Sequence, residues 1–171
     1  SQGSVIRIWQ EALRRGELLT ITDATATRFW VAMHEAVAAV WYAAQQETAG
    51  VLYVPHSPAF TVRDLAVAMI RKEYKLQSMH ADVALGVHTK DIGRRPAEKL
   101  HEVLLTEDEQ DRAAWSAAST CYLVPPVVRS WQETCDLSLF PAATFVTPYR
   151  SDVWPYRLTT EMLAHRLEAL T

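Results

Sequence analysis

Two adjacent arginines stand immediately before a proline in the run Ile92-Gly93-Arg94-Arg95-Pro96-Ala97-Glu98-Lys99-Leu100. Proline is favoured at the first position of a helix, so the run predicts a helix over residues 96–104. A helix N-terminus attracts anions through its free N–H groups, and arginine adds a forked pair of donors. The pattern favours a phosphate or diphosphate beside Arg95, with Glu98 placed to accept hydrogen bonds from sugar hydroxyls. A solvated turn before an ordinary charged helix start would have the same pattern.

Another arginine, Arg28, lies in a β-prone and aromatic segment, Thr25 to Val31. An arginine that points inward from such a segment needs a partner, because burying an unpaired charge is costly. That partner is either the phosphate of a ligand or an internal carboxylate such as Asp23. The sequence leaves both alternatives open.

Several patterns that carry catalysis are absent from the sequence. The five glycines lie too far apart to form the glycine-rich turn of a dinucleotide site or a phosphate loop. No tyrosine is followed four residues later by a lysine, and no Gly-x-Ser-x-Gly elbow occurs. No histidine has a second His or Cys at the spacing of a metal site. We therefore expect this chain to hold no cofactor, no metal ion and no catalytic group, and we expect Cys121 in the core.

The composition is that of a soluble protein with one domain over residues 1–171. A hydrophobic content of 49% is enough to bury a core, and the formal net charge of −3 argues against nucleic-acid binding. No apolar run is long enough to cross a membrane, and no signal segment is evident. Cys121 and Cys135 do not make a disulfide framework, so we expect reduced thiols and a cytoplasmic location.

Short strands that alternate with amphipathic helices predict an α/β protein, or α+β when the chain is isolated. Residues 125–157 hold five prolines and are expected to be mostly irregular. Val37, Val40 and Trp41 share one face of a predicted helix. Helices are expected over residues 4–15, 33–46, 61–73, 96–104 and 159–170. Strand-like segments are expected over residues 18–22, 25–31, 51–54, 83–87 and 120–124.

These motifs combine into a family resemblance that covers nearly the whole chain in order. The segments that carry it are Gly3–Ile6, Leu19–Asp23, Thr27–Trp30, Glu35–Val37, Gly50–Pro55, Asp64–Ala66, Gly93–Glu102, Tyr122–Pro125 and Tyr149–Thr159. They resemble the UDP-N-acetylglucosamine 4,6-dehydratase family of extended short-chain dehydrogenases, whose hallmark is Gly-x-Arg-Pro-Gly-Glu-Lys-Leu-His-Glu. The likeness is greatest to the inverting enzymes of bacterial surface-polysaccharide or nonulosonate sugar synthesis.

The resemblance implies a role in binding rather than in catalysis. In that family, an N-terminal Rossmann domain binds NADP and carries Tyr-x-x-x-Lys. The complete enzyme oxidises C4 of the UDP-sugar, eliminates water across C5–C6 and returns the hydride. This chain would be the substrate-binding C-terminal part, without a complete Rossmann domain and inactive alone. The resemblance places the diphosphate on Arg28 and Arg95 and the ribose near Glu98. It places the uridine in a pocket lined by Ser4, Val5 and Ile21.

The sequence also departs from the family. Ala97 replaces a glycine of the hallmark and removes a permissive backbone position, Arg7 replaces a common proline, and Gln77 to Asp91 is longer than its equivalent. Ala97 and the missing Rossmann half favour the alternative of a non-enzymatic oligomerisation or interaction protein derived from the binding half, whereas Arg28, Arg95 and Glu98 favour the binding role. A small α/β protein with accidental similarity is disfavoured by the order of the motifs.

The resemblance also predicts a partner. Without a Rossmann half, the strand from Gly50 to Pro55 would have an unpaired edge and the helix from Met33 would have an uncovered apolar face. We therefore expect a homo-oligomer or a separate Rossmann-type chain as the partner, with a UDP-sugar as the ligand.

Overall fold

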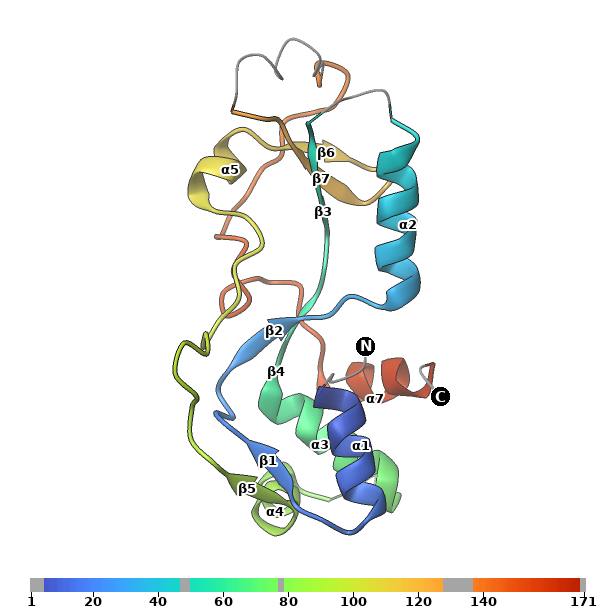
Figure 1. The fold of residues 1–171 in the computed structure, drawn as a ribbon, viewed down its shortest axis with the longest axis vertical. Coiled ribbons are helices and arrows are strands. Elements are labelled where there is room, and N and C mark those ends of the chain that lie inside the picture. Colours follow the sequence, from blue (N-terminus) through green and yellow to red (C-terminus); the bar gives the residue numbers. More distant parts are fainter. Residues whose placement is uncertain (1–4, 47–49, 77–78, 128–136, 170–171) are drawn as a thin grey trace. The chain divides into compact units, whose positions relative to one another are not determined.

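The computed structural model describes residues 5–46, 50–76, 79–127 and 137–169 (Figure 1). The chain forms two compact units, each assembled from segments that are distant in sequence. Unit 1 is made of Ser1–Arg28, Phe60–His101 and Arg157–Thr171, and unit 2 is made of Phe29–Ala59 and Glu102–Tyr156. Both consist of helices and short strands, which confirms the α/β class expected from the sequence. The single substrate-binding domain expected over the whole chain stays a prediction.

Unit 1 is built around helix α3 (Val62–Tyr74). The Thr61 hydroxyl accepts a hydrogen bond from the Asp64 N–H at 3.0 Å and donates one to the Asp64 carboxylate at 2.6 Å, which caps the helix. All residues from Leu65 to Ile70 are buried, so the helix is covered around its whole circumference. Helices α1 (Val5–Arg14), α4 (Ala81–His88) and α7 (Thr160–Glu168) pack against it.

Polar contacts fix the C-terminal helix α7 to α3. The ammonium of Lys72 donates to the carbonyl of Leu167 at 2.9 Å, which caps the last turn of α7. At the other end, the Thr160 hydroxyl donates to the carboxylate of Asp64 at 3.3 Å. Leu163 and Leu167 are buried between these contacts. The third segment of unit 1 is therefore held by both packing and helix capping.

Two parallel strands of unit 1 bring the chain to the candidate site. Strand β1 (Leu19–Ile21) pairs with β5 (Thr89–Asp91), with Leu19 opposite Thr89 and Ile21 opposite Asp91. The N–H of Ile92 then donates to the carbonyl of Ile21 at 2.9 Å. This pairing places the loop after β5 beside the carboxyl end of β1. Two further strands, β2 (Thr27–Phe29) and β4 (Ala59–Thr61), pair with each other.

Unit 2 contains an antiparallel sheet with the strand order β3-β7-β6. The strands are β3 (Leu52–Pro55), β6 (Ala114–Ser116) and β7 (Cys121–Val124), and every residue of β7 is buried. Helix α2 (Met33–Ala44) lies beside β3 (Figure 1), and the short helix α5 (Glu107–Asp111) precedes β6. The hydroxyls of Tyr42 on α2 and Ser116 on β6 lie 3.3 Å apart.

An aromatic cluster centred on Tyr149 forms the core of unit 2. The ring of Tyr149 lies 4.2 Å from Trp154 and 5.1 Å from Phe29, measured between ring centroids. Its hydroxyl accepts from the N–H of Ser57 at 2.6 Å and donates to the carbonyl of Pro55 at 2.8 Å. Burial raises the pKa of this phenol well above its ordinary value. The neutral hydroxyl therefore fixes the end of β3 to the aromatic core.

Two sequence predictions were wrong. Residues 83–87 form part of helix α4 and not a strand; the segment packs against α3, with Ala84 buried, so tertiary packing overrides its mixed local propensity. No helix begins at Pro96, since Ala97 has a φ of +64°, which ends any α-helical continuation. The remaining expected helices and strands are present, with ends that differ by a few residues.

Removing the hydroxyl of Tyr149 tests how β3 is held. We expect Tyr149→Phe to lower the free energy of unfolding by about 1–3 kcal/mol, because the buried Ser57 N–H loses its partner and the Pro55 carbonyl loses one of its donors. Urea unfolding followed by near-ultraviolet circular dichroism measures this. The matched control is Tyr156→Phe, at a residue 39% exposed, which should change stability little. Equal effects of the two substitutions would contradict the interpretation.

Candidate functional site

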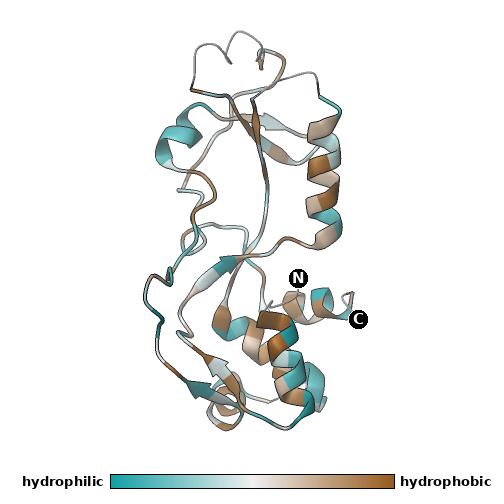
Figure 2. Cartoon of the chain, in the orientation of Figure 1, coloured by the Kyte–Doolittle hydropathy of each residue, from teal (hydrophilic) through white to brown (hydrophobic). Residues whose placement is uncertain are grey.

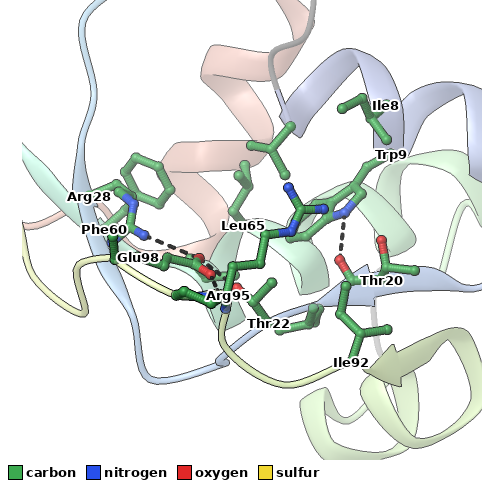
Figure 3. A pocket seen from close by; sticks show the side chains of 15 residues that line it. Ile8, Trp9, Thr20, Thr22, Arg28, Phe60, Leu65, Ile92, Arg95 and Glu98 are labelled. Atoms are coloured by element: carbon green, nitrogen blue, oxygen red, sulfur yellow. Dashed lines mark hydrogen bonds and ion pairs between the residues drawn. The ribbon is translucent and has the colours of Figure 1, made fainter.

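A cavity of about 530 Å³ opens in unit 1 between α1, the carboxyl end of β1, the start of α3 and the loop after β5 (Figure 3). Its size falls in the range of about 300–1,000 Å³ that is typical of small-molecule sites. All of its walls belong to unit 1, although they come from segments far apart in the chain. The cavity is therefore a property of the fold of that unit.

One side of the cavity is apolar. Trp9 of α1 is only 2% exposed, and its indole N–H donates to the carbonyl of Thr20 at 3.1 Å. Ile21, Phe60 and Leu65 are buried beside it, while Val5 lies partly exposed on the wall. The hydrogen bond gives the indole N–H a partner, and the apolar ring forms part of the cavity wall.

The other side of the cavity carries charge. The guanidinium of Arg28 donates through Nη1 to the carbonyls of Thr27 at 2.7 Å and Leu100 at 3.1 Å. Its Nη2 lies 3.6 Å from the carboxylate of Glu98. Glu98 is therefore an internal partner of Arg28, while the carboxylate of Asp23 accepts from Thr25 in a local turn.

Glu98 is held by three groups. The Thr22 hydroxyl donates to it at 2.6 Å, the Arg95 N–H donates at 3.2 Å, and the Arg28 guanidinium lies opposite. These contacts lower the pKa of Glu98, with the Thr22 hydrogen bond the largest cause and the two arginines adding to it. Glu98 is therefore an ionised acceptor at neutral pH, even without a ligand.

The positive charge of this site comes from side chains and not from a helix end. The loop from Gly93 to His101 contains no helix, so the expected helix N-terminus beside Arg95 is absent. Gly93 and Ala97 both adopt left-handed backbone, with φ values of +73° and +64°. Figure 3 shows the exposed side chain of Arg95 extending across the cavity in the direction of Trp9.

The structure brings together nearly all of the residues predicted from the sequence. Arg28, Arg95, Glu98, Val5 and Ile21 line the same cavity. Ser4 lies outside the described residues. The roles of these residues in holding a ligand stay predictions.

Sequence reasoning missed several contributors to the site, among them Trp9 and Thr22. Trp9 falls within the helix expected over residues 4–15, and nothing in its local pattern marks it as a ligand contact. Thr22 follows the carboxyl end of a parallel strand, a position where ligand-binding groups gather, and that rule could have identified it.

Three further features, metal binding, membrane spans and the cysteines, concern the described residues. Within them, no group of three or more His, Cys, Asp or Glu side chains is placed to hold a metal ion. No helix in the described ranges is long and apolar enough to cross a membrane. Cys121 is buried in β7 with its thiol 3.4 Å from the carbonyl of Ser119, while Cys135 lies outside the described residues.

Known proteins are similar to this chain in sequence. Residues 1–122 match the family described as "Polysaccharide biosynthesis protein". The UDP-N-acetylglucosamine 4,6-dehydratase (inverting) of Campylobacter jejuni serotype O:2 is 30% identical over 110 residues, which are 64% of this chain and 29% of that protein. The UDP-glucose 4-epimerase of Rickettsia conorii is 33% identical over 113 residues, which are 66% of this chain and 30% of that protein. The chain thus spans about a third of the length of these curated relatives.

A solved structure shares the fold. The crystal structure of Pen from Bacillus thuringiensis matches with a TM-score of 0.79 and 23% sequence identity, over 100% of this chain and 46% of that one. The sequence match over residues 1–122 and the shared fold both agree with the family motifs found in the sequence. The chain belongs to the polysaccharide biosynthesis family of extended short-chain dehydrogenases.

Proposed function

We propose that this chain is the nucleotide-sugar-binding portion of a sugar-nucleotide 4,6-dehydratase and takes a UDP-N-acetylglucosamine-like ligand in the cavity of unit 1. One observation carries the proposal: Arg28, Arg95 and Glu98 face one cavity whose opposite wall is apolar. Cations and a fixed acceptor beside an apolar surface match a ligand with a diphosphate, a hydroxylated ring and a flat base. The names of the curated relatives, a dehydratase and an epimerase of UDP-sugars, support the same ligand class.

The electrostatics of the site suit an incoming diphosphate. Arginine binds phosphate oxygens through strong charge-assisted hydrogen bonds. The 3.6 Å separation of Arg28 from Glu98 is longer than a hydrogen bond, so this contact can yield to a ligand oxygen. Glu98 keeps its hydrogen bonds to Thr22 and to the backbone of Arg95 and can accept from the ribose.

This chain supplies ligand binding, and no step of the hydride chemistry is assigned to it. The sequence holds no glycine-rich turn and no Tyr-x-x-x-Lys. Of the described glycines, Gly16, Gly86 and Gly93 face open space rather than a close-fitting cradle. We therefore place NADP on a Rossmann-type partner domain outside residues 1–171, without which these residues are inactive.

An apolar face of α2 supports the existence of that partner. Met33, Val37, Val40 and Trp41 share this face and are 67%, 59%, 70% and 69% exposed. The residues that α2 turns toward its own unit are small or polar, such as Ala39, which packs on the core, and Tyr42. Figure 2 shows the hydrophobic character of this helix. A row of large apolar side chains left to solvent is typical of a docking surface.

The ligand proposal is tested by calorimetric titration of the chain with UDP and UDP-N-acetylglucosamine. We expect both to bind and Arg95→Ala to weaken binding roughly tenfold or more, because a charge-assisted phosphate contact is lost. Arg94→Ala is the matched control. The side chain of Arg94, next to Arg95 in sequence, does not line the cavity in the described structure, so its removal should change UDP binding little. Absence of binding at millimolar ligand would contradict the proposal and favour the non-enzymatic alternative.

The partner proposal is tested on α2. We expect the isolated wild-type chain to self-associate at micromolar concentration and Trp41→Glu to shift it toward monomer, because a charge on the apolar face opposes its burial. Sedimentation velocity measures this. Leu139→Glu, at an apolar residue 90% exposed elsewhere in unit 2, is the control and should leave association unchanged. A wild-type chain that stays monomeric would argue against self-association through this face.

A further inference from the structure

Thr27, the residue that precedes Arg28, forms a side-chain hydrogen bond with His101. The Thr27 hydroxyl and Nδ1 of His101 are 2.9 Å apart, although they are 74 residues apart in sequence. Thr27 is only 4% exposed. Because a buried hydroxyl is costly to leave without a partner, this contact resists separation of the two segments.

The same two segments are also joined at the carbonyl of Leu100, one residue before His101. The N–H of Thr27 donates to the carbonyl of Leu100 at 2.9 Å, and Nη1 of Arg28 donates to the same oxygen at 3.1 Å. Strand β2 is thus held to the end of the loop at two successive residues, Leu100 and His101. This double attachment fixes the register between the strand and the loop and sets the direction of the Arg28 guanidinium.

We propose that Thr27 and His101 are a positioning pair for Arg28. They hold the strand that carries Arg28 against the loop that carries Arg95 and Glu98, so that both guanidinium groups face one diphosphate. The inference rests on the proposed function, because it takes the cavity as a diphosphate site. Neither side chain of the pair lines the cavity in the described structure. Their effect on a ligand is therefore transmitted through Arg28.

A fixed guanidinium has a physical advantage over a mobile one. An arginine side chain loses considerable rotamer freedom when it binds, and that loss is smaller when the free protein already holds it in place. The carbonyls of Thr27 and Leu100 provide such a hold on Nη1, and Nη2 is left directed toward Glu98. The positioning pair keeps both carbonyls within hydrogen-bonding distance of Nη1.

The test compares variants of Thr27 in the full chain by calorimetric titration with UDP. Thr27→Val keeps the shape but removes the hydroxyl, and we expect it to weaken UDP binding roughly three- to tenfold, the range of one lost hydrogen bond. Thr27→Ser keeps the hydroxyl and should bind within about twofold of wild type. Circular dichroism and thermal unfolding establish that each variant is folded.

Variants of His101 keep the inference falsifiable if Thr27→Val does not fold. In His101→Asn the amide takes the place of Nδ1 and should preserve UDP affinity better than His101→Leu. His165→Leu is the matched control, because His165 lies exposed on α7 in the same unit. It should leave UDP affinity unchanged.

A double-mutant cycle distinguishes positioning from general destabilisation. In an Arg28→Ala background, Thr27→Val should have no further effect on UDP affinity, because the residue through which it acts is gone. The inference would be overturned if Thr27→Val weakened UDP binding equally in the wild-type and Arg28→Ala backgrounds, or if a folded Thr27→Val chain bound UDP as wild type does. Either result would leave the proposed function intact. A wild-type chain that does not bind UDP would overturn the proposed function and this inference together.

Discussion

The hydrogen bond from Thr22 to Glu98 joins residues 76 positions apart in sequence, and the candidate site is organised around it. The same carboxylate accepts from the Arg95 N–H and faces Arg28, so one side chain connects the end of β1, the strand β2 and the loop after β5. An ionised carboxylate at this place neutralises part of the local positive charge. Both arginines interact favourably with this carboxylate in the free protein, before any ligand anion is bound.

The sequence was most informative where local signals and tertiary packing agree. Helix α3 combines an N-terminal Thr61–Asp64 cap with apolar residues, and the helix itself was expected over residues 61–73. The segment after Pro96 looked like a helix for equally good local reasons. It instead forms a loop, because Thr27 and Leu100 pair through their backbones and Ala97 takes a left-handed conformation. Such long-range pairing cannot be read from a local pattern.

The candidate site shows the same division. The motif resemblance identified Arg28, Arg95 and Glu98, and the fold brings them to one cavity. Which carboxylate pairs with Arg28 was left open, since the choice depends on the path of a loop about seventy residues later. For α2, the sequence indicated that Val37, Val40 and Trp41 share a face. That this face is exposed depends on the small residues of the opposite face, which fit against the unit 2 core.

The placement of two tryptophans gives the chain a pair of built-in spectroscopic probes. Trp9 is buried in the wall of the cavity, whereas Trp41 is exposed on the apolar face of α2. Biosynthetic incorporation of fluorotryptophan would label all six tryptophans, and single substitutions would assign the resonances of Trp9 and Trp41. Entry of a small molecule would then perturb the Trp9 signal and coverage of α2 the Trp41 signal. A single labelled sample would report both events independently, including the order in which they occur.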